Sequence, residues 1–136
     1  MSVLIDTNVV SELRKRLRCD PGVAAWFARV PAEEIFLSVL TIGEIRRGVE
    51  NIRRRDISAA EVLEAWLDDL VTTYANRFLS VDQSIAERWG HLSVPDPVPI
   101  IDGLLAATAL VYGLTLVSRN LKDIKRTGVR CIDPFT

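Results

Sequence analysis

Short, almost wholly apolar segments alternate with amphipathic segments along this chain. Nearly continuous apolar runs of four to six residues bounded by polar residues or turns are typical of strands buried in a parallel sheet. We expect such strands at residues 2–5, 35–40, 77–81, 114–118 and 129–132. Strands that alternate with helices require helices on both faces of the sheet. The predicted fold class is therefore α/β, with a central parallel β-sheet of four to five strands flanked by helices.

Helix-start and helix-stop signals divide the segments between the expected strands. A helix start is indicated by a polar cap before proline, or by a Ser or Thr followed three residues later by Glu. These starts are Asp20-Pro21, Thr41 with Glu44, Ser58 with Glu61, and Asp82. Gly113 is the expected C-terminal glycine of an alanine-rich helix. The predicted helices cover residues 8–17, 20–30, 41–51, 58–71, 82–89 and 101–112.

Size and composition indicate one domain spanning residues 1–136. With 136 residues, of which 49% are hydrophobic, the chain is long enough to build its own core. No apolar run approaches the roughly 20 residues that span a bilayer, so we expect a soluble, cytoplasmic protein. Cys19 and Cys131 belong to no CxxC pair, so we expect reduced thiols and no zinc site.

Basic residues are clustered although the net charge is only −1. Of the 17 basic residues 14 are arginines, which suit bidentate contacts to phosphate. Runs such as Arg14-Lys15-Arg16, Arg46-Arg47 and Arg53-Arg54-Arg55 also occur on solvated helix faces. Composition alone therefore does not distinguish a nucleic-acid surface from an ordinary one.

Polar residues follow several of the expected strands. Asp6 ends the first strand, Glu44 follows the second, and Asn120 and Asp123 follow the fourth. The carboxyl ends of parallel strands meet at one edge, where α/β proteins bind ligands. Carboxylates gathered there raise one another's pKa unless a cation neutralises them, and Mg²⁺ and Mn²⁺ prefer oxygen ligands. This edge is a predicted divalent-metal site.

Asp102 belongs to this set only if the proline-rich loop before it runs towards the same edge. Each acid also has a simpler interpretation, because Asp6, Glu44 and Asp102 stand at predicted helix starts, where carboxylates cap free N–H groups. His91 is the only histidine, so a two-histidine ribonuclease mechanism is excluded. No GxSxG, GxGxxG, GxxxxGK[ST] or HExxH pattern occurs.

Four ordered motifs carry a family resemblance over nearly the whole chain. They are VLIDTNVVSEL at residues 3–13, SVLTIGEI at 38–45 with Gly48, PIID at 99–102 followed by LAATA at 105–109, and LVSRN at 116–120 with Lys122-Asp123 and Gly128-Val129. Together they resemble the VapC-type toxins of the PIN-domain family. Ser118 and Ile124 stand where many relatives have threonine and phenylalanine.

The resemblance implies a PIN fold and a metal-dependent ribonuclease acting as the toxin of a type II toxin–antitoxin pair. It implies Mg²⁺ or Mn²⁺ held by Asp6, Glu44 and Asp102, with Asp123 as a further candidate ligand. An RNA substrate, a cognate VapB-like antitoxin and a homodimer, with the possibility of a larger toxin–antitoxin assembly, are implied as well.

Within such a site we expect Asp6 and Asp102 to bind the metal directly and Glu44 to bind it or to orient the attacking water. Thr7, Ser118 and Asn120 are candidates for positioning these carboxylates by hydrogen bonding. The candidates for holding RNA are Arg119, Arg46 and Arg47.

Two other functions remain open from the residues. An aspartate-dependent phosphatase also uses an aspartate at a strand end, but it normally needs a second aspartate two residues later, where this chain has Asn8. A PIN-like module that binds RNA or protein without cutting is the second alternative.

Overall fold

Five parallel strands form the centre of the molecule. The computed structural model describes all 136 residues. The strands are β1 (Val3–Ile5), β2 (Ile35–Ser38), β3 (Phe78–Leu79), β4 (Thr115–Val117) and β5 (Cys131–Ile132). Their order across the sheet is β3-β2-β1-β4-β5, and every neighbouring pair is parallel. The predicted α/β fold class is confirmed, and β1 lies in the middle with β2 and β4 on either side.

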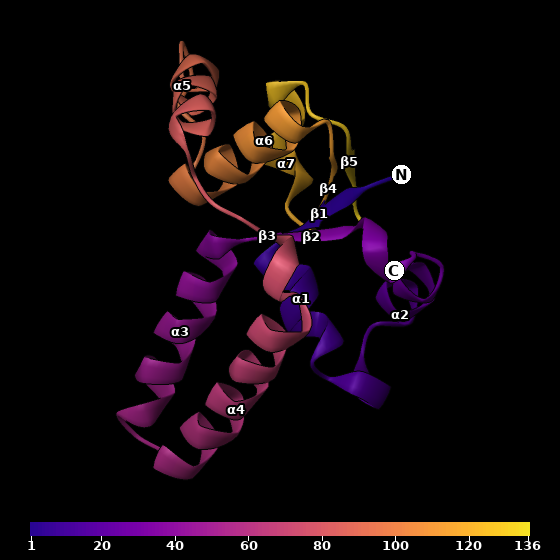
Figure 1. The fold of residues 1–136 in the computed structure, drawn as a ribbon, viewed down its shortest axis with the longest axis vertical. Helices are drawn as coiled ribbons and strands as arrows, with labels where there is room; N and C mark the ends of the chain where they lie inside the picture. The colour runs from indigo at the N-terminus through magenta and orange to yellow at the C-terminus, as the bar shows by residue number, and fades with distance from the viewer.

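Seven α-helices cover both faces of the sheet. They are α1 (Thr7–Leu13), α2 (Pro21–Ala28), α3 (Val39–Arg53), α4 (Ile57–Thr73), α5 (Gln83–Leu92), α6 (Ile100–Tyr112) and α7 (Leu121–Ile124). Short 3-10 turns occupy Arg16–Arg18, Ala32–Glu34, Ala75–Arg77 and Lys125–Thr127. Helices α1, α3 and α4 lie on one side of the sheet, α5, α6 and α7 lie on the other, and α3 and α4 project away from it as a long pair (Figure 1).

The central strand divides its side chains between two buried clusters. Val3 and Ile5 pack with residues of α1, α2, α3 and α4, whereas Leu4 packs with residues of α6 and α7. All three side chains are almost completely buried. This alternation follows from the two-residue period of a strand. Because both faces of β1 are buried, the strand contains only apolar residues, and the first polar residue is Asp6, directly after it.

Both predicted capping boxes are wrong. Helix α3 begins two residues earlier than expected because the Ser38 side chain accepts a hydrogen bond from the Leu40 N–H, 3.1 Å away. Helix α4 is capped by Asp56, which accepts from the Ala59 N–H, rather than by Ser58. The correction matters for Glu44, which therefore lies in the second turn of α3 and caps no helix.

Other boundaries are closer to expectation. Asp20 and Asp82 cap α2 and α5, and Gly113 ends α6 with a left-handed φ of 68°. Helix α1 stops at Leu13, four residues before the predicted end. The backbone leaves the right-handed helical region at Arg16, which has a φ of 54°, and Leu17 after it is fully exposed. The segment after Leu13 offers the core no apolar face to bury.

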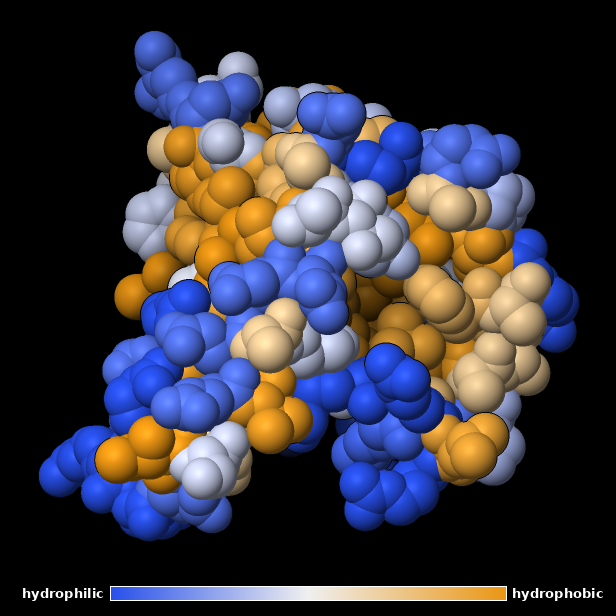
Figure 2. Space-filling view, turned by 60° about the horizontal axis from the view of Figure 1, so that its bottom comes forward, coloured by the Kyte–Doolittle hydropathy of each residue, from blue (hydrophilic) through white to orange (hydrophobic).

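The surface carries apolar residues between polar ones. Figure 2 shows hydrophobic residues in several places on this face, with hydrophilic residues between and around them. None of the helices combines the length and the apolar character needed to cross a membrane.

Both cysteines, Cys19 and Cys131, are free thiols.

Candidate active site

Asp6 lies at the carboxyl end of the central strand and is only 5% exposed. Its backbone N–H donates to the Val117 carbonyl in β4, 2.8 Å away. The Ser118 hydroxyl donates to Asp6 Oδ2 at 2.7 Å, and the Thr7 N–H donates to Oδ1 at 2.7 Å. Because β1 and β4 are hydrogen-bonded neighbours, the residue that follows β4 reaches the carboxylate that follows β1. The Ser118 hydroxyl therefore lies against the Asp6 carboxylate, and its role in positioning a metal ligand stays a prediction.

Glu44 is brought to the same edge by α3. Thr7 Oγ1 donates to Glu44 Oε1 at 2.5 Å and lies 3.0 Å from Thr41 Oγ1. A hydroxyl carries one proton and a carboxylate only accepts. Thr7 therefore donates to Glu44 while the buried Thr41 hydroxyl donates to Thr7. This chain of hydroxyls ties α3 to the residue next to Asp6.

Asp102 joins the cluster from the first turn of α6. The Asn120 side-chain amide donates to Asp102 Oδ2 at 3.0 Å, and the Asn120 backbone N–H donates to the Ser118 hydroxyl at 3.0 Å. Ser118 and Asn120 thus link Asp6 to Asp102 through the turn after β4. The loop that precedes α6 runs towards this edge, which answers the question that the sequence left open.

The carboxylates influence one another electrostatically. Burial raises the pKa of Asp6, and the nearby Glu44 charge raises it further, against the hydrogen bonds from Ser118 and Thr7. The pKa of Asp102 is raised by burial, then by the charges of Asp6, Asp123 and Glu44, against the hydrogen bond from Asn120. Four acids from four separate segments therefore share one electrostatic environment.

Asp123 lies in the first turn of α7 and is partly buried. The residue before that helix is Asn120, whose side chain makes no capping hydrogen bond and donates through its amide to Asp102. Asp123 lies inside α7 and not at its capping position, and its side chain accepts no hydrogen bond from a helix N–H. Its charge contributes to the field at Asp102.

The oxygen atoms of this cluster suit a hard divalent cation, although they do not enclose one. No three Asp, Glu, His or Cys side chains form a group that would hold a metal ion by themselves. Asp102 Oδ1 and Glu44 Oε2 accept no hydrogen bond from the protein, and neither residue has an ion-pair partner. Mg²⁺ typically binds one or two carboxylates and keeps several waters. The donor set fits that kind of coordination.

Two residues of the site were not identified as positioning residues from the sequence. The Asn8 amide lies 3.4 Å from both Asp6 Oδ2 and Ser118 Oγ, and its carbonyl oxygen accepts from the Arg119 N–H at 3.2 Å. Thr41 is the buried hydroxyl next to Thr7. Asn8 could have been suspected from its place two residues after Asp6, whereas nothing local distinguishes Thr41.

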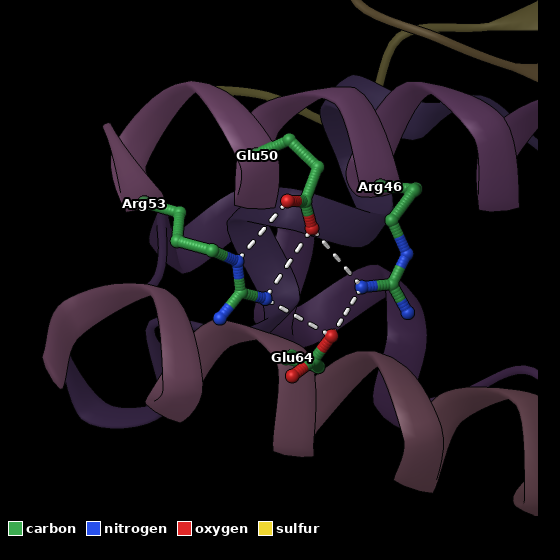
Figure 3. Close-up of polar contacts among 4 residues, drawn as sticks. All are labelled: Arg46, Glu50, Arg53 and Glu64. Carbon is green, nitrogen blue, oxygen red and sulfur yellow. Dashed lines mark hydrogen bonds and ion pairs between the residues drawn. The ribbon is translucent and has the colours of Figure 1, made fainter. Parts of the chain in front are cut away.

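The three candidate RNA-binding arginines have different surroundings. Arg46 is paired with Glu50 and Glu64, and Arg53 joins the same network between α3 and α4 (Figure 3). The Arg119 guanidinium lies 4.6 Å from the centre of the Phe135 ring. Arg47 is exposed, makes no hydrogen bond or ion pair within the chain, and lines a hollow together with Glu44.

Three hollows open on the surface, and only the smallest contacts the acid cluster. Two hollows of about 810 and 580 Å³ lie over α5 and share Gln83, Glu87 and His91. They contain none of the four acids. The third, of about 260 Å³, includes Glu44 and Ile101, the neighbour of Asp102. The candidate site is therefore located by the hydrogen-bonded acids and not by the volume of a hollow.

Comparisons with known proteins identify the family and the fold. The family model described as PIN domain matches residues 3–129. The chain is 29% identical to "Toxin FitB" of Neisseria gonorrhoeae over 98% of both chains. It is 45% identical to "Ribonuclease VapC14" of Mycobacterium tuberculosis over 52% of this chain and 68% of that protein. The crystal structure of FitAcB from Neisseria gonorrhoeae contains a similar chain, with a TM-score of 0.87, 28% identity and 97% of each chain covered.

Proposed function

Since this chain belongs to the PIN-domain family, whose model matches residues 3–129, we propose that it is a Mg²⁺- or Mn²⁺-dependent endoribonuclease acting as the toxin of a toxin–antitoxin pair. Relatives named as a ribonuclease and as a toxin support the proposal. The observation that carries it is the convergence of Asp6, Glu44 and Asp102 at the carboxyl edge of the sheet, linked by Thr7, Ser118 and Asn120.

The carboxylates have distinct proposed roles. Asp6 and Asp102 would hold the cation directly, and Glu44 would bind it or orient the attacking water. When bound, a divalent cation supplies charge neutralisation at the phosphate and an activated water at neutral pH. The chain itself supplies the orientation: Ser118 holds Asp6, Asn120 holds Asp102, and Thr7 holds Glu44. Asp123 is the candidate for a further ligand on the side of Asp102.

Partners are part of the same proposal. The resemblance to VapC-type toxins and the similarity to "Toxin FitB" support a cognate antitoxin and a homodimer. An enzyme that cuts cellular RNA acts where that RNA is, so a cytoplasmic location is proposed with it. Of the three arginines considered for RNA, Arg47 has the most suitable surroundings, because its guanidinium is exposed and unpaired beside Glu44.

A labelled-RNA assay tests the proposed activity. Purified protein is incubated with a 5′-fluorescein single-stranded RNA in Mn²⁺, in Mg²⁺ and in EDTA, and the products are separated on a denaturing gel. We expect cleavage with either metal and none with EDTA, and Asp6→Asn or Asp102→Asn should abolish it. Binding of the RNA without cleavage would instead support a non-cutting PIN-like module. Hydrolysis of p-nitrophenyl phosphate with intact RNA would support the phosphatase alternative.

A further inference from the structure

The small hollow beside the acids is formed by two helices that start at the site. Val39, Leu40, Gly43, Glu44 and Arg47 line it from one stripe of α3, and Ile101 closes it from the first turn of α6. In Figure 1 the beginnings of α3 and α6 lie next to each other at the edge of the sheet. The stripe follows helical spacing, in which residues three or four apart are neighbours. The hollow is therefore continuous with the site that contains Glu44 and Asp102.

The residues that line the hollow combine three apolar side chains with one unpaired basic side chain. Val39, Leu40 and Ile101 are the hydrophobic members, and Arg47 is the only basic one. Arg46, one residue earlier, is paired with Glu50 and Glu64 between α3 and α4, as Figure 3 shows. Arg47 has no such partner. A guanidinium that is unpaired next to an apolar surface suits a phosphate joined to a flat, apolar group.

The space is kept open by a glycine. A Cβ atom added at Gly43 would meet nothing within 4 Å, and the residue lies in the interior of α3 with an ordinary helical backbone. Glycine at such a position lowers helix stability relative to alanine. Neither packing nor backbone conformation requires it here. The missing side chain leaves room over the stripe between Val39 and Arg47.

We propose that this hollow binds one nucleobase of the RNA next to the scissile phosphate, with Arg47 holding the adjoining phosphate. The inference rests on the proposed ribonuclease function and adds the substrate contact. Single-stranded RNA is recognised by splaying bases onto apolar or aromatic surfaces while cations hold the backbone. A volume of about 260 Å³ is below the range for drug-sized ligands and suits a single ring system. The base in the hollow sets a sequence preference beside the cut.

Filling the hollow tests the proposal without touching the acids. Gly43→Leu places a side chain in it, and Gly48→Leu is the matched control, because a Cβ at Gly48 in the same helix also meets nothing within 4 Å but does not line the hollow. Both replacements favour the helix, so both proteins should fold with unchanged or higher melting temperature. Gly43→Gln fills the same space with a polar chain and serves if the leucine variant does not fold.

The substrate is a fluorescein-labelled RNA pool with a randomised centre, cut in Mn²⁺ and sequenced at the new ends. We expect wild type and Gly48→Leu to show a base preference at one position beside the cut. Gly43→Leu should lose that preference and raise KM roughly tenfold, the effect of losing one stacked base. Its melting temperature should rise on adding Mn²⁺ as that of the wild type does.

Each outcome bears on a different statement. Cleavage by Gly43→Leu with the wild-type preference and KM would overturn the base-binding role and leave the nuclease proposal standing. If the wild type cuts nothing in Mn²⁺ or Mg²⁺, the nuclease proposal fails. The hollow is then tested by fluorescence anisotropy of the same pool in EDTA, where Gly43→Leu must bind more weakly than Gly48→Leu. Equal binding by the two variants would overturn the inference.

Discussion

The side-chain amide of Asn120 donates a hydrogen bond to Asp102 Oδ2 over 3.0 Å, and this contact joins the turn after β4 to the first turn of α6. Asp102 is partly exposed and receives no other hydrogen bond from the protein. Its carboxylate would otherwise rotate freely in a first helical turn. The amide of Asn120 therefore orients the carboxylate that α6 brings to the site.

Asn120→Ala should lower the rate of RNA cleavage by roughly 10- to 100-fold, the usual cost of removing a group that orients a metal ligand. The fold should remain, because the residue is exposed and Ser118 keeps its bond to Asp6. Cleavage rate and Mn²⁺ affinity, the latter from thermal shifts, are the measurements. Lys122→Ala, an exposed change two residues away, is the control. Equal rates for the two variants would contradict the positioning role.

Asp102→Asn should raise the melting temperature of the metal-free protein by a few degrees. The carboxyl pKa of Asp102 is raised above its ordinary value of 3.8 by burial and by the charges of Asp6, Asp123 and Glu44. The ionised form therefore destabilises the fold at neutral pH, and this effect is relieved as pH falls through the raised folded pKa. Differential scanning calorimetry in EDTA from pH 7 to pH 4 should show the variant's advantage shrinking.

Adding Mn²⁺ should give the wild type a higher melting temperature than Asp102→Asn. A ligand that binds only the folded state stabilises it in proportion to its affinity, and Asp102→Asn removes one proposed ligand. Wild type should gain melting temperature with Mn²⁺ while the variant gains little. Asp96→Asn, at an exposed residue without side-chain hydrogen bonds, should behave as wild type in both conditions. A variant that responds to Mn²⁺ as strongly as wild type would remove Asp102 from the ligand set.

Thr7→Val should cost about 1 kcal/mol of unfolding free energy, the typical net value of one hydrogen bond. The change keeps the shape of the side chain but removes the donor to Glu44 Oε1 and the acceptor for Thr41. Cleavage should fall about tenfold, since Glu44 is no longer held. Urea unfolding and cleavage rates are compared with Thr72→Val, an exposed change on α4. A stable variant with full activity would show that Glu44 needs no such support.

Glu64→Gln should weaken the link between α3 and α4 in a pH-dependent way. Hydrogen bonds from Arg46 and Arg53 lower the pKa of Glu64 below its ordinary value of 4.5. Stability from this contact is present above that value and lost as pH falls through the lower, folded pKa. The variant should therefore be slightly less stable than wild type at pH 7, equal to it near pH 2, and less different in high salt. Glu61→Gln, exposed and unpaired on the same helix, provides the comparison.

Local pattern located every strand but not its ends. The predicted strands 35–40, 77–81 and 129–132 shorten to Ile35–Ser38, Phe78–Leu79 and Cys131–Ile132, because α3 already begins at Val39 and the two edge strands pair over two residues only. The apolar runs ending at Asp6 and Ser118 are strands in the structure because a strand buried on both faces needs consecutive apolar residues, and that need is visible in the sequence itself. The helix caps were less predictable. Thr41 and Ser58 each have a capping-box partner, yet Ser38 and Asp56 are the caps. Competing caps a few residues apart differ by little free energy, so packing decides between them.

The sequence by itself determined which residues could share a site, since strand ends in a parallel sheet meet at one edge and Asp6, Glu44 and Ser118 follow such ends. Only the tertiary structure decided that Asp102 joins them, because the path of the loop before α6 depends on packing between distant segments. It also decided that Arg46 is bound by Glu50 and Glu64 while Arg47 is free. Adjacent residues on a helix point about 100° apart, and which direction meets a partner depends on where the neighbouring helix lies.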